Sequence, residues 1–376
     1  MEKIPFNRKR KIRTWQHSNE AALLDGINAS YNKISLIDLA SNDYLGLNTD
    51  PRIIDAANLA MNSNGVGSGG SHLVTGSRPI HKELESALSK WLGREHVLLF
   101  PSGFQANLAA VIALANRKTL VIADKLIHYS LLVGIKASGA KLKRFAHNDL
   151  NELEKALKLS EHENTLVITE SLFSMEGTNP ELKPIATLCK KFGASLFVDE
   201  AHALGIMGPE GRGLCYELSD SIKMISGTFG KAFGGGGAFL ATNKVFGEHL
   251  IQTSGPFRYT TALAPPLAAA ALEALKIIQE NPFWGKELIK KANNWREKIA
   301  SKGWGYAPGN GPILSIIIGT DEESLYYQNK LEKNGLLGVA IRPPTVPEGT
   351  SRLRIVVRRD LPNESLEKLI FCLGRK

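Results

Sequence analysis

Hydrophobic positions along the chain follow two periods, which alternate between about residues 97 and 242. Short apolar, β-branched runs predict strands at 97–100, 119–124, 142–146, 165–170, 195–200, 223–227 and 237–242. Apolar residues at helical spacing lie between them, as in 150–157, where Asp149 stands at the N-cap position. Near-continuous apolar strands joined by helices predict an α/β fold with a mostly parallel sheet covered on both faces.

The pattern changes after about residue 276. A long charged helix is expected at 285–303, a strand at 311–319, then another helix, a strand at 351–359 and a closing helix. This pattern predicts a smaller α+β domain with a partly antiparallel sheet. We therefore expect an N-terminal segment at 1–42, a large domain at 43–276 and a small C-terminal domain at 277–376.

Composition narrows the class of protein. The chain has 376 residues, of which 43% are hydrophobic and 22% charged, as in ordinary globular proteins. No apolar stretch is long enough for a membrane span, and the N-terminus lacks the apolar core of a secretion signal. Cys189, Cys215 and Cys372 are far apart, without metal-type spacing, so we expect reduced cysteines, a cytoplasmic protein and no metal site.

The net charge of +9 includes a basic cluster at residues 8–13. Positive charge attracts nucleic acid, but it equally attracts an anionic substrate or cofactor. Because the other basic residues are dispersed along mixed-charge helices, the sequence favours phosphate-bearing small molecules over nucleic acid.

Two glycine-rich stretches resemble nucleotide-binding motifs, but neither meets all the requirements of its motif. In "SGTFGKAFGGGGAFL" (226–240), a P-loop would need glycine where Ile225 stands and serine or threonine where Ala232 stands. "GVGSGG" (65–70) matches the dinucleotide fingerprint, but a helical pattern precedes it where a strand is required. A nicotinamide-dependent oxidoreductase is therefore a remote alternative, and Lys231 needs another explanation.

Polar residues gather where the expected strands end. In parallel sheets, ligands bind beyond the carboxyl ends of the strands. Each of these residues alone has an ordinary explanation, such as a helix cap or a surface histidine, but a shared strand edge suggests one ligand. The residues are Gly103 and Phe104 at a helix start, His128, Ser174, Asp199, His202, Thr228 and Lys231.

A phosphorylated pyridine aldehyde would use these residue types together. A lysine would bind the aldehyde covalently, and a buried carboxylate would keep the ring nitrogen protonated so that the ring accepts electrons. An imidazole could stack on the ring, and helix N-terminal N–H groups would hold the phosphate. In that order these roles fall to Lys231, Asp199, His128 and Gly103/Phe104, with the Thr228 hydroxyl beside the phosphate. The predicted cofactor is pyridoxal 5'-phosphate.

The motifs "SNDYLGL", "GSGGSHLVTGS", "SLFSMEG", "VDEAHALG" and "GTFGKAFG" together resemble the α-oxoamine synthases. The resemblance runs from about Asn42 to the last helix. It implies the fold-type-I, aspartate aminotransferase-like fold of pyridoxal-phosphate enzymes. It also implies an acyltransferase that condenses an amino acid with an acyl thioester and releases carbon dioxide.

The segment "IRPPTVPEGTSRLRI" (341–355) resembles the branch that joins L-alanine to a pimeloyl thioester in biotin synthesis. The carrier of the thioester, coenzyme A or an acyl-carrier protein, stays open. Glycine-using relatives, of the 2-amino-3-ketobutyrate ligase or 5-aminolevulinate synthase type, are the alternative.

The resemblance also implies residue roles. Lys231 would shuttle the Cα proton, and His202 and Ser174 would lie near the phenolic oxygen of the cofactor. Arg354 would bind the amino-acid carboxylate, and His128 would contact substrate as well as cofactor. Thr345 and an N-terminal arginine, assigned to Arg13 with Arg8 and Arg10 as rivals, would touch the acyl substrate. A homodimer with the site at its interface is implied, in which Thr260 and Thr261 of the second subunit contact the phosphate.

Overall fold

The computed structural model describes residues 5–18, 20–27 and 33–376. The chain divides into two compact units. The first, here called the sheet unit, comprises Leu47–Phe173 and Asn179–Gly285. The second, the terminal unit, joins Met1–Gly46, Ser174–Thr178 and Lys286–Lys376. The domain boundaries expected at 42/43 and 276/277 stay a prediction.

The sheet unit is built on seven strands with the order β4-β10-β9-β8-β7-β5-β6. Strand β10 runs antiparallel to both of its neighbours, and all other pairs are parallel. The strands are β4 (His96–Phe100), β5 (Thr119–Asp124), β6 (Lys141–Phe145), β7 (Asn164–Glu170), β8 (Ser195–Asp199), β9 (Met224–Thr228) and β10 (Ala238–Thr242). These bounds confirm all seven strands expected from the sequence, and the mostly parallel sheet.

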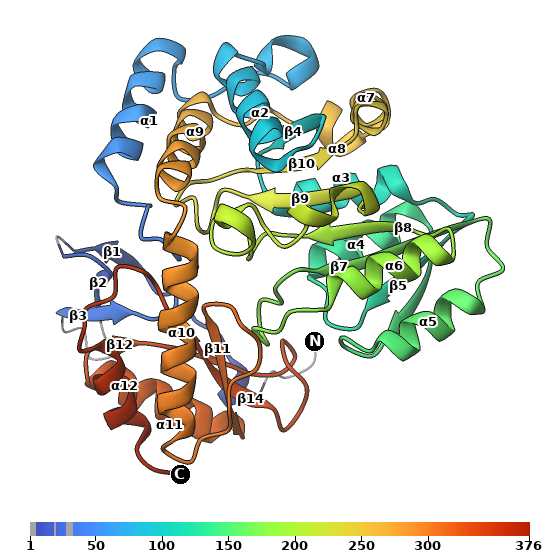
Figure 1. Ribbon diagram of the computed structural model, residues 1–376. Helices are drawn as coiled ribbons and strands as arrows, with labels where there is room; N and C mark the ends of the chain where they lie inside the picture. The colour runs from blue at the N-terminus through green and yellow to red at the C-terminus, as the bar shows by residue number, and fades with distance from the viewer. Residues whose placement is uncertain (1–4, 19, 28–32) are drawn as a thin grey trace. The chain divides into compact units, whose positions relative to one another are not determined.

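Helices cover both faces of this sheet; in Figure 1, α6 lies in front of β7 and β8 and α4 behind them. The Asp149 side chain caps α5 as expected, because it accepts the Glu152 N–H at 2.9 Å. The helices are α1 (Pro51–Asn64), α2 (Pro79–Leu92), α3 (Gly103–Leu114), α4 (Tyr129–Ser138), α5 (Leu150–Lys158), α6 (Leu182–Lys191), α7 (Lys244–Thr253), α8 (Gly255–Arg258) and α9 (Pro265–Glu280).

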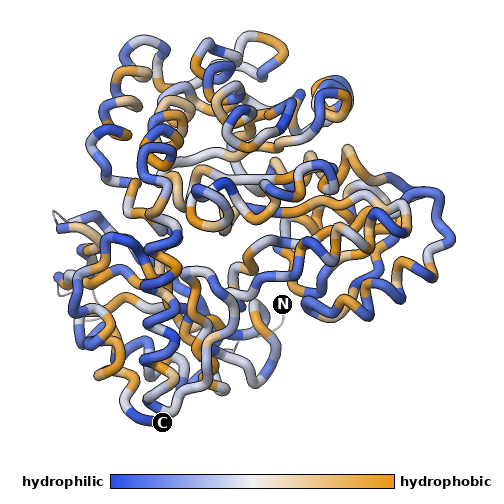
Figure 2. The backbone as a smooth tube through the Cα atoms, in the orientation of Figure 1, coloured by the Kyte–Doolittle hydropathy of each residue, from blue (hydrophilic) through white to orange (hydrophobic). Residues whose placement is uncertain are grey.

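The core of the sheet unit lies between the strands and helices α3 and α4. Phe100, Val111, Leu131, Ile168 and Phe197 are among its fully buried or nearly buried members. Figure 2 shows the strands mostly in hydrophobic colours, whereas α5 alternates between hydrophilic and hydrophobic positions. Burial of this apolar surface, at roughly 25 cal/mol per Å², is the main force that fixes the strand edge where the polar residues lie.

The terminal unit contains two small sheets, with strand orders β1-β2-β3-β12 and β11-β14-β13. The second sheet is wholly antiparallel, which confirms the partly antiparallel α+β region expected after residue 276. The helices and strands of the terminal unit are β1 (Trp15–His17), β2 (Leu23–Ile27), β3 (Lys33–Asp38), α10 (Trp284–Ala300), β11 (Ile313–Gly319), α11 (Asp321–Lys333), β12 (Leu336–Leu337), β13 (Val339–Ile341), β14 (Ser351–Val356) and α12 (Ser365–Leu373). No helix among the described residues is long and apolar enough to cross a membrane.

Candidate functional site

Strand register brings the predicted polar residues of the sheet unit to one edge. Glu170 at the end of β7 is paired with Asp199 at the end of β8, and Asp199 is paired with Ser226 of β9. His128 follows β5, which lies on the other side of β7. The parallel arrangement therefore places the carboxyl ends of four strands side by side, as the sequence pattern predicts.

Asp199 is the buried anion of this edge, with 6% of its surface exposed. Its Oδ1 accepts the Ala201 N–H at 2.9 Å, and its Oδ2 accepts the Asn107 side-chain amide at 2.7 Å. Both of these donors are neutral, so they orient the carboxylate without neutralising its charge. A cation placed against this carboxylate would be held strongly in so buried a position.

Asn107 is a member of the site that the sequence analysis missed. It lies four residues after Gly103, on the same face of α3, and its amide donates both to Asp199 and to Ser130 Oγ at 3.0 Å. The spacing within "GFQAN" was the available signal, because a polar residue one turn into an apolar helix requires a buried partner.

His128 is fixed by three hydrogen bonds. Its N–H donates to Glu170 Oε1 at 2.5 Å, and its Nδ1 lies 2.7 Å from Ser130 Oγ and accepts the Ser130 N–H at 3.3 Å. Burial lowers the pKa of His128; the negative charge of Asp199 opposes this, and the positive charge of Lys231 adds to it. The imidazole is therefore neutral near pH 7, and it feels the charges of both Asp199 and Lys231.

Thr228 and the start of α3 form a second polar group. Thr228 Oγ1 donates to the Gly237 carbonyl at 3.0 Å and accepts the Gly230 N–H at 3.2 Å. A Cβ added to Gly103 would lie 3.8 Å from Thr228 Cβ, so the two residues are neighbours. The first N–H groups of α3 carry the partial positive charge of a helix N-terminus.

The remaining predicted residues of the sheet unit lie around these two groups. Lys231 is half-buried in the turn after β9, and His202 is buried in the turns after β8. Phe104 is 41% exposed at the start of α3. Thr260 Oγ1 accepts the Gln105 side-chain amide of the same chain at 3.0 Å, and Thr261 is exposed.

These residues fit pyridoxal 5'-phosphate chemically. Asp199 offers a buried, oriented anion for a protonated ring nitrogen, and His128 offers a neutral flat ring. Lys231 supplies a primary amine, and the α3 N-terminus supplies N–H donors for a phosphate, with Thr228 beside it. Asn107 Oδ1 is buried without a hydrogen-bond partner among the described residues, which leaves an acceptor available at the same edge. Among the described residues, no group of three histidine, cysteine, aspartate or glutamate side chains is arranged to hold a metal ion.

Glu200, next to Asp199, stabilises the turn that follows β8. It is fully buried, and its Oε1 accepts the N–H groups of Leu214 and Cys215 at 2.8 and 3.2 Å. Burial raises its pKa to about 7, against the lowering effect of hydrogen bonds from Cys215 and Leu214. A side chain at Gly213, where φ is +89°, would meet Glu200 Oε2 at 2.1 Å, so only glycine leaves room for this carboxyl.

In the terminal unit, Arg354 is held by the "SNDYLGL" motif and by the segment after β7. Its Nε donates to the Ser174 carbonyl at 2.7 Å and its Nη2 to Asn42 Oδ1 at 2.8 Å. Both acceptors are neutral, and the guanidinium is 6% exposed. Burial lowers its pKa, an effect that Tyr44 and the nearby carboxylate of Glu176 oppose. Ser174 thus contacts Arg354 through its backbone.

The same motif carries a buried ion-pair network. Arg358 Nη1 lies 2.6 Å from Asp38, and its Nη2 lies 3.1 Å from Asp43 and 2.8 Å from Asp360. The arginine is 2% exposed. The buried guanidinium explains why this stretch contains an aspartate, since Asp43 is one of its three carboxylate partners; loss of Arg358 would leave buried carboxylates without their counter-ion.

The three N-terminal arginines have different partners. Arg8 is paired with Asp321 and Glu348, and Arg13 with Glu332 at 2.5 Å. Arg10 instead donates through Nη2 to Thr345 Oγ1 at 2.8 Å, a neutral acceptor. The choice of Arg13 as substrate contact stays a prediction, and these contacts favour Arg10, which was one of its two rivals.

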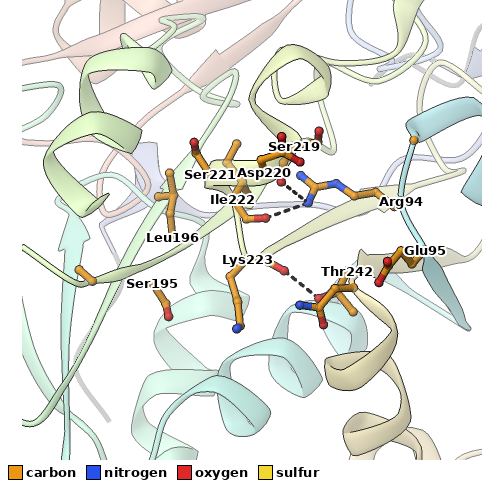
Figure 3. Close-up of a pocket in the computed structure, with 13 residues that line it drawn as sticks. Arg94, Glu95, Ser195, Leu196, Ser219, Asp220, Ser221, Ile222, Lys223 and Thr242 are labelled. Atoms are coloured by element: carbon orange, nitrogen blue, oxygen red, sulfur yellow. Dashed lines mark hydrogen bonds between the residues drawn. The ribbon is translucent and has the colours of Figure 1, made fainter. Parts of the chain in front are cut away.

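A pocket of about 670 Å³ lies at the other end of the strands (Figure 3). It is lined near the starts of β8 and β9, by residues that include Ser195, Ile222 and Lys223. Arg94 is anchored there by hydrogen bonds to the carbonyls of Ser219 and Ile222, both 2.8 Å. None of the predicted site residues lines this pocket. Substitutions at the pocket can therefore serve as controls for substitutions at the strand edge that holds Asp199.

"GVGSGG" does not have the surroundings of a dinucleotide-binding loop. Helix α1 ends at Asn64, directly before it, and a π-helical turn, His72–Gly76, follows it. The fingerprint needs a strand before the glycines and a helix that begins on them. The structure therefore gives the oxidoreductase alternative no support.

Comparisons with known proteins agree with this geometry. The chain is similar to the 8-amino-7-oxononanoate synthases of Alkalilimnicola ehrlichii, with 38% identity over 91% of this chain and 88% of the relative, and of Anaeromyxobacter dehalogenans, with 41% identity over 86% and 82%. Among solved structures, it is similar to Sphingomonas wittichii serine palmitoyltransferase (TM-score 0.89, 28% identity, 94% of this chain and 89% of that one).

It is also similar to the 8-amino-7-oxononanoate synthase of Francisella tularensis (TM-score 0.78, 28% identity, 90% of this chain and 96% of that one). A structure of SPT with PLP internal aldimine matches with a TM-score of 0.90 and 27% identity, over 96% of this chain and 91% of that one. The profile of aminotransferases of class I and II matches residues 34–371. The chain therefore belongs to the aminotransferase class I and II family, and has its fold-type-I architecture.

Proposed function

We propose that this chain catalyses the reaction of an 8-amino-7-oxononanoate synthase. In this reaction L-alanine is joined to the acyl carbon of a pimeloyl thioester, with release of carbon dioxide and the thiol carrier, as a step of biotin synthesis. The observation that carries the proposal is the buried carboxylate of Asp199, which neutral donors hold in place. It lies at the same strand edge as the turn after β9 that contains Lys231. The similarity to synthases of this name over most of the chain supports it.

Pyridoxal 5'-phosphate is the proposed cofactor. When bound, it withdraws electrons from the Cα of the amino acid, so that negative charge at this carbon becomes tolerable. Asp199 would keep the ring nitrogen protonated, and His128 would cover one face of the ring. Thr228 and the N–H groups of Gly103 and Phe104 would hold the phosphate, with His202 and Ser174 near the phenolic oxygen.

Lys231 would anchor the cofactor and move the proton at Cα. A lysine amine that is neutral and close to the reacting carbon is suited to this proton transfer. Removal of this proton lets Cα form a bond to the thioester carbonyl carbon as the C–S bond breaks. Loss of carbon dioxide follows, and a proton returns to the same carbon.

Substrate recognition is assigned to the terminal unit. Arg354 would bind the carboxylate of alanine, because its guanidinium is oriented by neutral partners and can form a two-point contact with a carboxylate. Thr345 and Arg10 would contact the far carboxylate of the pimeloyl chain, since Arg10 carries a charge that its Thr345 partner does not neutralise.

A homodimer is part of the proposal, with Thr260 and Thr261 contributed to the phosphate of the second subunit. The thioester carrier is coenzyme A or an acyl-carrier protein; both are anionic, and the exposed Lys9 and Lys11 suit either. The second candidate function is condensation by a glycine-using relative. The segment 341–355 favours the alanine-using branch.

The test is a product assay with purified protein supplied with pyridoxal 5'-phosphate. Alanine and glycine are each offered with pimeloyl-CoA, acetyl-CoA and succinyl-CoA, and the products are identified by mass. We expect turnover with alanine and pimeloyl-CoA at least tenfold above every other pair. Preferred turnover of glycine would assign the chain to the glycine-using branch instead.

A further inference from the structure

The N-terminal strap, defined here as residues 5–13, is attached to the terminal unit chiefly through Arg8. The Nε atom of Arg8 lies 2.8 Å from Asp321 Oδ2. Its Nη1 and Nη2 atoms lie 2.7 and 2.5 Å from the two oxygens of Glu348. All three nitrogens of the guanidinium therefore bind carboxylate oxygens, and the contact with Glu348 is the bidentate kind that fixes orientation as well as charge.

Asp321 connects Arg8 to the strand that carries Arg354. Its Oδ1 accepts the hydroxyl of Ser351, the first residue of β14, at 2.5 Å. Burial raises the pKa of Asp321, but the hydrogen bonds from Ser351 and Arg8 outweigh this effect and hold the pKa below its usual range. Asp321 also stands in the first turn of α11, where a negative charge is favoured by the helix N-terminus.

Glu348 belongs to the 342–350 loop, which connects β13 to β14 and also contains Thr345. The loop and the strap are joined a second time, because Arg342 donates to the backbone carbonyl of Asn7. Two residues after Arg8, Arg10 reaches Thr345. The ion pairs of Arg8 and the contact of Arg10 are thus made by adjacent parts of the same two segments.

We infer that Arg8 is a positioning residue which, through Asp321 and Glu348, holds the strap on the 342–350 loop and so presents Arg10 beside Thr345 to the acyl substrate. This inference rests on the proposed function for the identity of that substrate. An arginine side chain loses much rotational freedom when it binds a ligand, and a backbone already held in place lowers that cost. Loss of Arg8 should therefore weaken binding of the thioester and leave the alanine-binding and proton-transfer steps unaffected.

The first measurement follows the strap and needs no substrate. The amides of Arg8 and Lys9 are bonded to the carbonyls of Pro5 and Phe6 in a single helical turn, so they report its order by hydrogen exchange. In Arg8→Gln, exchange of the peptide that covers the strap should accelerate at least fivefold. The exchange rate of this peptide in Arg8→Lys should lie between those of Arg8→Gln and the wild type, because lysine keeps the charge but not the bidentate contact.

The second measurement is steady-state kinetics of the same proteins. Arg8→Gln should raise the KM for pimeloyl-CoA at least fivefold, with kcat and the KM for L-alanine within twofold of wild type. Glu348→Gln should have a similar effect, and the double variant should be no worse than Arg8→Gln alone, because both changes remove one contact. Arg52→Gln is the control: Arg52 also forms an ion pair with an aspartate, 2.8 Å from Asp50, but on α1 of the sheet unit.

Unchanged exchange of the strap in Arg8→Gln would overturn the inference. So would faster exchange with an unchanged KM for the thioester, or an equal rise in the KM values of both substrates. If the wild-type protein does not turn over alanine and pimeloyl-CoA, the proposed function fails on its own; the exchange result then still supports or overturns the role of Arg8 in holding the strap.

Discussion

The strand edge of the sheet unit and the N-terminal strap of the terminal unit both gather charged and polar side chains, but they are built differently. At the strand edge, β-strand pairing and the apolar core fix the backbone, and side chains such as Asp199 are 6% exposed. In the strap, the backbone is held by side chains, and Glu348, the partner of Arg8 in the 342–350 loop, has 73% of its side chain exposed.

This difference predicts how each region responds to change. A buried polar group that loses its partner costs the full desolvation of that group, so substitutions at the strand edge should have large, all-or-none effects. Exposed ion pairs are weak and screened by salt, so substitutions in the strap should have graded effects that depend on ionic strength. The first region suits chemistry, which needs fixed geometry; the second suits the binding of a long, flexible substrate.

The largest effect is expected from Lys231→Ala. Loss of the amine that anchors the cofactor and moves the Cα proton should lower kcat at least a thousandfold, because acid–base catalysis alone contributes about 10²–10⁴. The visible absorbance of the purified protein with pyridoxal phosphate should change as well.

Lys223→Ala is the matched control for Lys231, since the two lysines flank β9 at opposite ends. Lys223 lies at the pocket of Figure 3, with its Nζ 3.9 Å from the centre of the Phe246 ring. Its removal should leave kcat within about twofold of wild type. Equal losses in the two variants would show that proximity to β9, and not the strand edge, governs activity.

The next largest effect is expected from Asp199→Asn, which keeps the size of the side chain and removes its charge. The new amide also places a donor opposite the Asn107 amide, which now donates to Asp199 at 2.7 Å. We expect kcat to fall at least a hundredfold and the affinity for pyridoxal phosphate to weaken.

Combining Asp199→Asn with Lys231→Ala should add little to the loss in Lys231→Ala alone, because residues that act in one step are not additive. Near-normal kcat in Asp199→Asn would mean that this carboxylate is not the partner of the cofactor ring.

The strand edge could be predicted from the sequence because its causes are local and periodic. Each apolar run marked a strand, and the parallel topology then brought the residues after the strands together. Asn107 was missed because its partner, Asp199, is set by how α3 packs on the sheet; the local spacing signals only that a buried partner is needed. Strands β1–β3 were missed as well, since they are short and interrupted by polar residues, and β3 pairs with a two-residue strand far along the chain.

The strap could not be predicted in the same way. Three arginines lie within six residues, and their spacing does not say which carboxylate each one meets. The partners of Arg8 and Arg13 lie more than 300 residues away, in α11 and the 342–350 loop. Only the folded structure of the terminal unit shows that Arg10 contacts a hydroxyl, whereas Arg8 and Arg13 form ion pairs.

A smaller effect is expected from Glu200→Gln, which should change how the free energy of unfolding depends on pH. Burial raises the pKa of Glu200 to about 7 from an ordinary value of 4.5. Between these values the folded protein retains a proton that the unfolded chain has lost, so stability falls as the pH rises through this window. Glu200→Gln cannot ionise and should escape that loss, which we expect to be about 1–3 kcal/mol.

The measurement is the unfolding free energy of wild type and Glu200→Gln at pH 5 and pH 8. The variant should gain relative to wild type as the pH rises, whatever constant offset the amide introduces. Glu85→Gln is a useful companion, because burial also raises the pKa of Glu85 to about 7, in α2. A difference between wild type and Glu200→Gln that is the same at both pH values would mean that Glu200 does not titrate in this window.

The smallest effect is expected from salt, and it concerns the strap. Raising NaCl from 0.05 to 0.5 M shortens the Debye length from about 14 to about 4 Å, which screens the exposed pair of Arg8 with Glu348 far more than the buried contacts of Asp199. The KM for pimeloyl-CoA should rise about two- to threefold while kcat stays within about 1.5-fold.

Part of that rise in KM comes from screening of the anionic thioester itself, and the Arg8→Gln variant separates the two causes. If the strap contributes, the variant begins with a higher KM and responds less to salt than wild type. Parallel salt responses of the two proteins would assign the whole effect to the substrate.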